Sequence, residues 1–196
     1  MKSFINFLIE NPVLEEPRDI ERKPVKRELP ENAYSLGTFT HTGIDYHFFG
    51  HSEHRDSPFI QERQHTGYIT TKDDNGKHTV VGVSDFYPDQ NEHNTFVSNY
   101  PKLNKEHKTR GLMSLLYKKM ADHNKFTLKS DRIHTYGGYN VWWELSQMGR
   151  VTAHNLNKPS ARGVEYVGSN PKHLTKFYKG SPTMNPARWV FKYKGI

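Results

Sequence analysis

The chain has 196 residues, 34% of them hydrophobic and 13% aromatic, which is the size and composition of one globular domain with a substantial core. Its 28 Lys and Arg residues outnumber 21 Asp and Glu residues. The resulting formal charge of +7 favours anionic partners such as nucleic acid, a phosphorylated cofactor or an acidic protein. The sequence has no cysteine, which excludes a disulfide scaffold and thiolate chemistry. It also has no run of about 18 apolar residues, so we expect no membrane span and no membrane partner.

The N-terminal part differs in composition from the rest of the chain. The first ten residues, MKSFINFLIE, have apolar side chains at helical spacing but no long apolar run and no small-residue cleavage site, so they do not predict a secretory signal peptide. Asn11 to Asn32 contains four prolines and dense mixed charge, which predicts a poorly ordered linker. We therefore expect residues 1–32 to form a targeting segment and linker, and residues 33–196 to form the folded domain.

From Tyr34 onward the pattern predicts strands. YSLGTFTHTGIDYHFFGH alternates apolar and polar residues around Thr42-Gly43, which indicates a hairpin. TGYITTKDDNGKHTVVGVSDFYP predicts a second hairpin, in which Asp74-Asn75-Gly76 supplies the positive φ angles of a tight turn. Thr95 to Leu103 predicts a further strand, and Pro101 within it indicates an edge or a bulge.

Two helices are expected in the second half of the chain. The first begins at Leu112, has Leu115, Leu116 and Met120 on the same apolar face, and ends at Asn124. The second, in GGYNVWWELSQMGRV, starts after two glycines and ends at Gly149. A short strand in KFTLKSD separates the helices, and RVTAHNL and ARWVFKYK predict two last strands.

This order of elements, with LNKEHKTRGLM between a strand and the first helix, resembles the Gcn5-related N-acetyltransferase (GNAT) family. The acetyl-CoA signature of that family is Val-x-Pro-x-x-Arg/Gln-x-x-Gly-x-Gly/Ala. Its fixed positions fall on Leu103, Lys105, Lys108, Gly111 and Met113, of which only the glycine is a strict match. The resemblance covers about Leu36 to Tyr193 as topology. It implies an α+β fold, an α/β sandwich with a mixed, mostly antiparallel twisted sheet flanked by helices, and acetyl-CoA as the cofactor.

Physical chemistry supports a cofactor site in the same segment. A diphosphate is bound well by backbone N–H groups at a helix N-terminus, and a glycine there permits close approach. Basic side chains beside the glycine add charge-assisted hydrogen bonds. The expected cofactor-binding residues are Leu103, Lys108, Thr109, Arg110, Gly111, Leu112 and Met113. The alternative is that Gly111 only starts the helix and that the charges form a solvated face.

The resemblance also implies direct transfer of an acetyl group to an amine. A general base takes a proton from the amine, the amine attacks the thioester carbonyl, and a strand N–H holds the oxyanion. We expect Asp85 to be the base, with Glu106 or His107 as the next candidates. The family's catalytic tyrosine falls on Leu145, so the role of proton donor to the departing thiolate passes to Tyr136, Tyr139 or a water.

Two segments resemble phage proteins. MKSFINFLIEN is similar to the capsid-targeting peptide of internal head proteins of T-even-like phages, which ends at a protease site of the form Leu or Ile, any residue, Glu. LKSDRIHTYGGYNVWWEL is similar to a pattern in phage-encoded GNAT-like proteins. The candidate cleavage triplets are Leu8-Ile9-Glu10, Leu14-Glu15-Glu16 and Leu29-Pro30-Glu31. These resemblances imply a virion protein of the capsid interior, packaged with DNA and acting in the host cytoplasm.

Other patterns leave alternatives open. His47 and His51 share a strand face, but no carboxylate or second cluster completes a ligand set, so we expect no metal. The C-terminal residues 170–195 interleave lysines and arginine with aromatics, which fits either single-stranded nucleic acid binding or a two-faced strand. Three functions follow. The first is an acetyltransferase that acts on an unknown amine of a host protein or small molecule. The second is an inactive GNAT-fold internal virion or host-interaction protein, and the third is a DNA-binding head protein.

Overall fold

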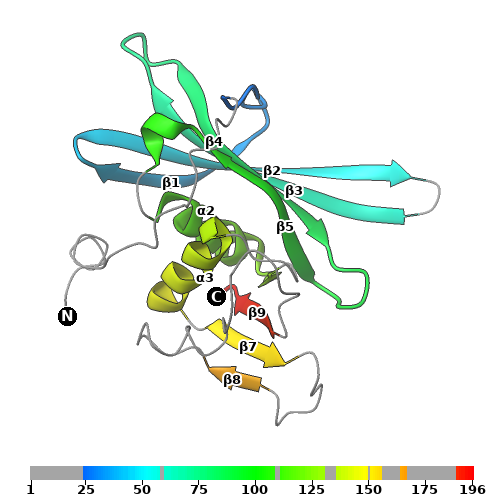
Figure 1. The fold of residues 1–196 in the computed structure, drawn as a ribbon. Coiled ribbons are helices and arrows are strands. Elements are labelled where there is room, and N and C mark those ends of the chain that lie inside the picture. The colour runs from blue at the N-terminus through cyan, green and yellow to red at the C-terminus, as the bar shows by residue number, and fades with distance from the viewer. Residues whose placement is uncertain are drawn as a thin grey trace.

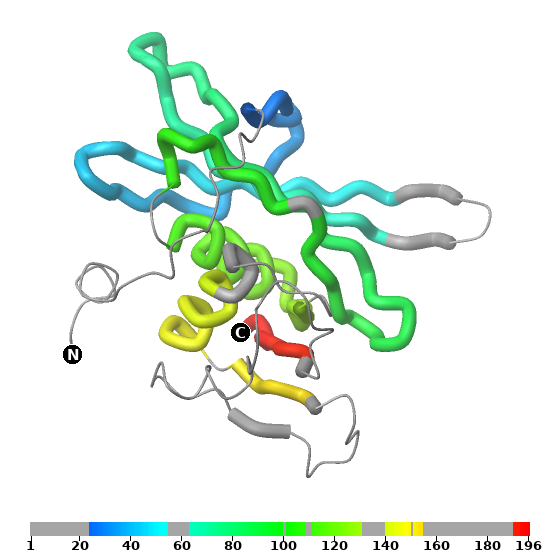
Figure 2. Tube along the Cα trace, in the orientation of Figure 1, coloured from blue at the N-terminus to red at the C-terminus, as the bar shows by residue number. Residues whose placement is uncertain are grey.

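The computed structural model describes residues 24–57, 60–108, 111–130, 136–149, 151–155, 164–166 and 189–196 (Figures 1 and 2). These residues form one mixed sheet, two α-helices and a short 3₁₀ helix, η1. The strands are β1 Tyr34–His41, β2 Ile44–Ser57, β3 Ile60–Lys72, β4 His78–Pro88, β5 Thr95–Leu103, β6 Thr127–Lys129, β7 Val151–Asn155, β8 Val164–Tyr166 and β9 Trp189–Lys194. The helices are η1 Lys105–His107, α2 Leu112–Asn124 and α3 Tyr136–Met148.

The sheet has nine strands in the order β1-β2-β3-β4-β5-β6-β9-β7-β8. All neighbouring pairs are antiparallel except β5 and β6, which are parallel and are joined through α2. The last strand, β9, is inserted between β6 and β7. Figure 1 shows both helices on one side of the twisted sheet and residues 24–30 on the other. The predicted α+β fold with a mixed, mostly antiparallel sheet is therefore confirmed.

Turn chemistry explains the two hairpins that the sequence predicts. Thr42 and Gly43 connect β1 to β2 with φ angles of 49° and 78°. In the second turn only Gly76 has a positive φ, 77°, so the expectation that Asp74 and Asn75 share this role is wrong. The Asp73 carboxylate organises this turn instead, because it accepts hydrogen bonds from two later backbone N–H groups at 2.9 and 3.0 Å.

The helix boundaries agree with expectation for α2 and differ for α3. Helix α2 has the predicted bounds, Leu112–Asn124. It is followed by Lys125, a C-cap residue in the left-handed region with a φ of 54°. Helix α3 starts at Tyr136, one residue before the two glycines that were expected to precede it. Glycine is tolerated in a first turn because packing of α3 on α2 and β7 stabilises the helix. Strand β8 was not predicted, since three residues carry no usable periodicity.

The main core lies between the sheet and the helices and is rich in aromatic residues. Phe126, which follows α2, contacts Phe96 with ring centroids 4.6 Å apart and Phe86 at 6.0 Å. His65 on β3 completes this aromatic cluster, at 4.8 Å from Phe96 and 5.4 Å from Phe126. The opposite face of the sheet carries a smaller apolar cluster of Tyr68, Val80 and Val83, against which Val25, Leu29 and Phe49 pack.

His65 makes stability depend on pH. Only 3% of the residue is exposed, and its Nδ1 lies 2.8 Å from the Ser52 hydroxyl. Burial, with a smaller contribution from the charge of Arg63, lowers the pKa of His65 from 6.5 to about 4. Because this pKa is lower in the folded state, the unfolded chain takes up the proton first. The stabilisation is complete above pH 6.5 and is lost as the pH falls toward 4.

A His65→Leu variant tests this prediction. Urea denaturation from pH 7.5 to about pH 4.5 is expected to show a smaller fall in unfolding free energy for the variant than for the wild type. The difference between the two proteins isolates His65 from other titrating groups. Parallel pH dependence in both proteins would contradict the prediction.

Four charged side chains form ion pairs between the loop after β4 and strands β6 and β9. Lys129 on β6 contacts Asp89 at 2.7 Å and Glu92 at 2.8 Å, and Lys192 on β9 pairs with Glu92. Burial raises the pKa values of Asp89 and Glu92, but the hydrogen bonds of both carboxylates to Lys129 lower them. The net effect is that both pKa values are lower than usual. These two lysines are therefore neutralised within the fold.

Candidate functional site

The parallel strands β5 and β6 differ in length, since β6 has three residues and β5 has nine. They pair only where Thr95–Val97 lies beside Thr127–Lys129. Strand β5 continues to Leu103, and in the described part of the chain its last six residues have a strand partner only on the β4 side. Ligands of sheets with parallel strands bind outside the carboxyl ends of those strands. This end of β5 and β6 is thus the region in which to look for a site.

A bulge marks the same part of β5. Val83 pairs with Lys102 and Asp85 with Asn99, so one residue of β4 faces two residues of β5, one of which is Pro101. Proline has no N–H to donate to a ladder, and a bulge removes the need for one. The expectation that Pro101 lies at an edge or bulge is confirmed.

The chain between β5 and α2 leads to the predicted glycine. The Asn104 N–H donates to the Val81 carbonyl at 2.8 Å, and η1 follows. Lys108 is exposed, whereas Thr109 and Arg110 lie outside the described residues. Gly111 is the N-cap residue of α2, with φ 86° and ψ −12°, and this left-handed conformation favours glycine.

The first turn of α2 points its apolar side chains away from solvent. Leu112 is fully buried, and Met113 packs against the main core, as does Leu103 at the end of β5. The first N–H groups of a helix have no acceptor within the helix. The turn at Gly111 therefore combines backbone N–H groups that have no acceptor within the helix, a buried residue without a side chain and the exposed Lys108.

A buried carboxylate near this turn was missed by sequence reasoning. Glu144 on α3 is 5% exposed and accepts a hydrogen bond from the hydroxyl of Ser114, the third residue of α2. The positive end of the α2 dipole favours a carboxylate at this position. The signal in the sequence was an acidic residue directly between Trp143 and Leu145, both of which are buried.

Asp85 lies on the face of the sheet opposite the helices. Its neighbours Ser84 and Phe86 face the main core, where Ser84 contacts the Tyr117 hydroxyl at 3.3 Å and Phe86 packs on the Tyr117 ring. Because successive residues of a strand point to opposite faces, Asp85 faces away from α2. It is nevertheless 3% exposed.

The Asp85 carboxylate is held by three hydrogen bonds. The Arg27 guanidinium donates two, at 2.7 and 2.8 Å, and the Thr66 hydroxyl donates the third at 3.0 Å. The bond to Asp85 raises the pKa of Arg27. Arg27 therefore covers the carboxylate and has to move away before an amine can reach it.

The other expected catalytic residues do not gather around Asp85 in the described structure. Tyr136 and Tyr139 lie in the first residues of α3, and their side chains are outside the described part. Glu106 is exposed on η1. His107 packs edge-on against Tyr46 of the main core, with ring centroids 5.8 Å apart, so it lies on the side of the sheet away from Asp85.

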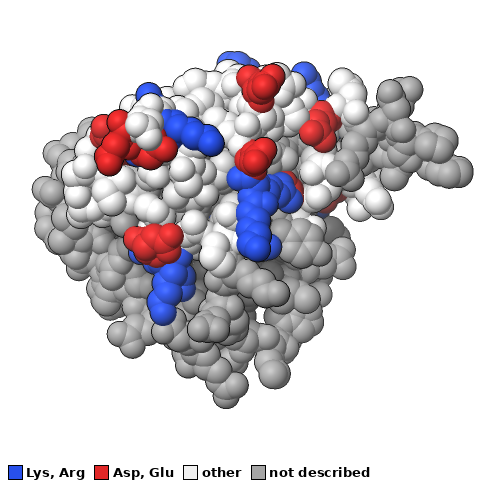
Figure 3. Space-filling view, turned by 90° about the horizontal axis from the view of Figure 1, so that it is seen from above, with Lys and Arg blue, Asp and Glu red and all other residues white. Residues whose placement is uncertain are grey.

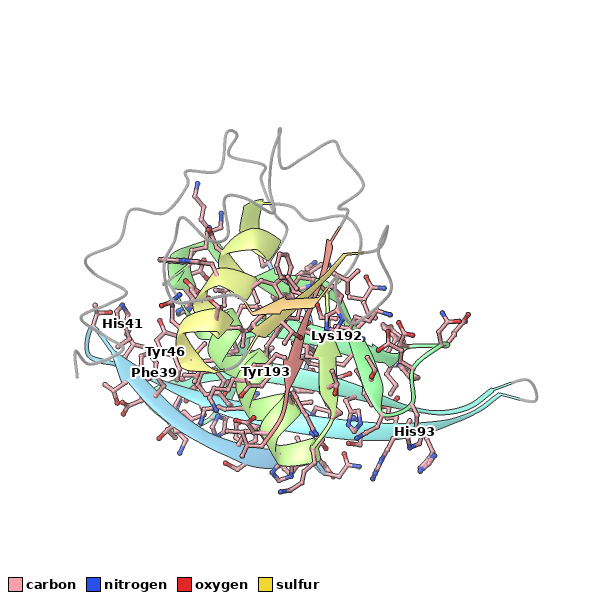
Figure 4. All side chains as sticks on the ribbon, turned by 90° about the horizontal axis from the view of Figure 1, so that it is seen from below. Phe39, His41, Tyr46, His93, Lys192 and Tyr193 are labelled. Carbon is pink, nitrogen blue, oxygen red and sulfur yellow. The ribbon has the colours of Figure 1, made fainter. Side chains whose placement is uncertain are left out.

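The described histidines are spread over several strands and make mostly aromatic contacts. His47 lies 5.0 Å from His78, and His41 stacks on Phe39 at the end of the β1–β2 hairpin (Figure 4). No group of three or more His, Cys, Asp or Glu side chains among the described residues is arranged to hold a metal ion. On the face shown in Figure 3, acidic and basic side chains are interspersed.

The C-terminal strand follows the two-faced pattern. Phe191 and Tyr193 are 1% exposed, whereas Lys194 is exposed (Tyr193 is labelled in Figure 4). This supports the structural interpretation of β9 over a stacking surface for nucleic acid. Residues 170–188, which carry the rest of the basic and aromatic pattern, lie outside the described residues.

Comparison with known proteins does not identify a family for this chain. No protein-family model, no curated protein and no solved structure matches the chain. In the described residues no helix combines the length and apolar character needed to cross a bilayer. The class defined by the fold is therefore an α+β protein with a mixed nine-stranded sheet.

Proposed function

We propose that this protein is a GNAT-like acyltransferase that binds acetyl-CoA between the carboxyl ends of β5 and β6. The observation that carries the proposal is the unit from β5 through Gly111 and α2 to β6. In this unit a left-handed glycine begins the helix that connects β5 to its parallel neighbour β6, which is only three residues long.

The diphosphate of the cofactor is assigned to the turn at Gly111. Backbone N–H groups of Gly111, Leu112 and Met113 bind the phosphate oxygens, and Lys108, with Thr109 and Arg110, supplies further donors and charge. The family signature has Gly or Ala at the position of Met113, and the Met113 side chain packs against the main core. Glu144 occupies the interior side of the same helix end, so the bound diphosphate relies on these flanking cations.

The pantetheine arm and acetyl group follow the side of β5 that faces away from β4. There a backbone N–H of β5 stabilises the oxyanion as the amine nitrogen attacks the thioester carbon. The carbon–sulfur bond breaks, an amide forms, and the amine nitrogen gives up one proton to Asp85. Tyr136 and Tyr139 are the proposed donors to the thiolate. Asp85 takes part only when Arg27 has left it.

A second candidate is a GNAT-fold protein without transfer activity that acts through a virion or host partner. It is favoured by the Asp85–Arg27 pair and by Leu145, which is fully buried where the family has a tyrosine. Packaging in a phage head stays a prediction, because residues 1–23 lie outside the described part.

Calorimetric titration of the full chain with acetyl-CoA tests the proposal. The full chain is used because Val25, Arg27 and Leu29 contact the sheet. Micromolar binding is expected, together with much weaker binding of acetyl-pantetheine, which lacks the diphosphate. Absence of binding at millimolar acetyl-CoA would exclude the enzyme and leave the second candidate.

A further inference from the structure

Residues 24–29 lie on the sheet in the manner of an extended bound peptide. Val25 and Leu29 are half-buried against the apolar cluster of Tyr68, Val80 and Val83, whereas Lys26 and Glu28 are exposed. Arg27 between them contacts Asp85, although its side chain is largely exposed, so contacts with the sheet recur at every second residue from Val25 to Leu29. The segment has no regular secondary structure of its own (Figure 1).

Two polar contacts fix the register of this segment. The Val25 N–H donates to the Asn104 side-chain oxygen at 2.8 Å. Two residues later, the Arg27 guanidinium makes its two bonds to Asp85. The exposures of the two partners are unequal, since 46% of the Arg27 side chain is exposed but only 4% of the Asp85 side chain.

This difference in exposure separates the two partners: Asp85 is a buried part of the sheet, and Arg27 approaches it from outside. Asp85 and Thr66 are neighbours on adjacent strands, and they are fixed in place by the ladder between β3 and β4. Arg27 reaches them from an irregular segment. A buried carboxylate is costly without a cation. The sheet thus presents a preformed acceptor for a guanidinium or ammonium group, and the chain fills it with its own arginine.

We propose that Asp85, Thr66 and Asn104 form a binding site for a basic peptide, and that residues 24–29 are its internal ligand. The contacts define the motif that such a peptide carries: an apolar residue, any residue, Arg or Lys, any residue, and an apolar residue. Asp85 binds the central cation, Asn104 binds the backbone N–H two residues before it, and the cluster of Tyr68, Val80 and Val83 receives the apolar side chains. Identifying this peptide as the amine acceptor rests on the proposed acyltransferase function. The proposal that the peptide binds does not rest on that function.

Arginine suits the role of internal ligand. Its guanidinium stays protonated in proteins, so it neither gives a proton to Asp85 nor becomes a nucleophile there. An external peptide competes with a ligand at high effective concentration, which lowers its apparent affinity for the wild-type protein. Removal of Arg27 removes this competition.

The experiment measures binding of a fluorescein-labelled peptide, KPVKRELPE, which has the sequence of residues 23–31, to full-length proteins in the absence of acetyl-CoA. The Arg27→Ala variant is expected to bind this peptide at least about tenfold more tightly than the wild type. Binding is expected to be lost in Arg27→Ala/Asp85→Asn, and lost for a peptide with alanine in place of its arginine. Circular dichroism and thermal unfolding establish that each variant is folded.

A second variant covers the case in which Arg27→Ala does not fold. Leu29→Asp keeps the Arg27–Asp85 pair but weakens the apolar anchor of the segment, and it too is expected to bind the peptide more tightly than the wild type. Equal binding to all variants, including Arg27→Ala/Asp85→Asn, would show general attraction of a charged peptide and would overturn the proposal. Because acetyl-CoA is absent, failure here is distinct from failure of the calorimetric titration.

Discussion

Replacement of Gly111 by glutamate is expected to weaken acetyl-CoA binding by at least about 100-fold, which corresponds to about 2.7 kcal/mol of binding free energy. The substitution places a carboxylate at the turn assigned to the diphosphate, so two like charges approach in a site built from backbone donors. The measurement is the same calorimetric titration, made on the variant.

Backbone strain has to be separated from this charge effect. Gly111 has a φ of 86°, so any side chain there is strained. Gly43 in the β1–β2 turn has a similar φ of 78°, and a Cβ added to it meets no atom within 4 Å. Gly43→Glu is therefore the control for backbone strain, at a position that is exposed whereas Gly111 is buried. It is expected to bind acetyl-CoA like the wild type, and equal loss of binding in both variants would contradict the assignment.

Local signals in the sequence were sufficient for the elements around the site. The turn at Gly43, the strand that ends at Leu103 and the helix from Leu112 to Asn124 all depend on neighbouring residues. A turn requires particular backbone angles, and a helix requires a period of 3.6 residues, so both leave a local pattern. The mixed, mostly antiparallel sheet was implied by the family resemblance, which rests on the order of these elements.

The partners of Asp85 and Glu144 could not be predicted from local sequence patterns. Arg27 is 58 residues from Asp85 in the chain, and Ser114 is 30 residues from Glu144. Such pairs depend on the register between strands and on the packing of one helix on another, which composition does not encode. Residues 24–32 were expected to belong to a linker on the basis of proline and charge, and yet Val25 and Leu29 contact the domain. Their alternation with exposed residues was a usable signal, but it was too short to stand out.

A Phe126→Ala variant is expected to lose about 3–5 kcal/mol of unfolding free energy, the largest stability effect predicted for a single side chain. Phe126 is 1% exposed and is the hub of the aromatic cluster, in contact with His65, Phe86 and Phe96. Its removal loses both the burial of the ring and its contacts with three neighbours. Urea denaturation at pH 7.5 measures the loss, and Ile196→Ala, at a residue that is 82% exposed, is the control and is expected to change stability by less than about 0.5 kcal/mol.

The same variant connects packing to titration. Burial is the main cause of the low pKa of His65, and Phe126 is one of the two rings that pack against it. Opening a space beside the imidazole admits water, so the pKa of His65 is expected to rise from about 4 toward 6.5 in Phe126→Ala. The acid-dependent loss of stability then becomes smaller, although the protein is less stable at every pH. An NMR titration of the imidazole measures this shift. An unchanged pKa would mean that the neighbouring side chains fill the cavity and keep water away from His65.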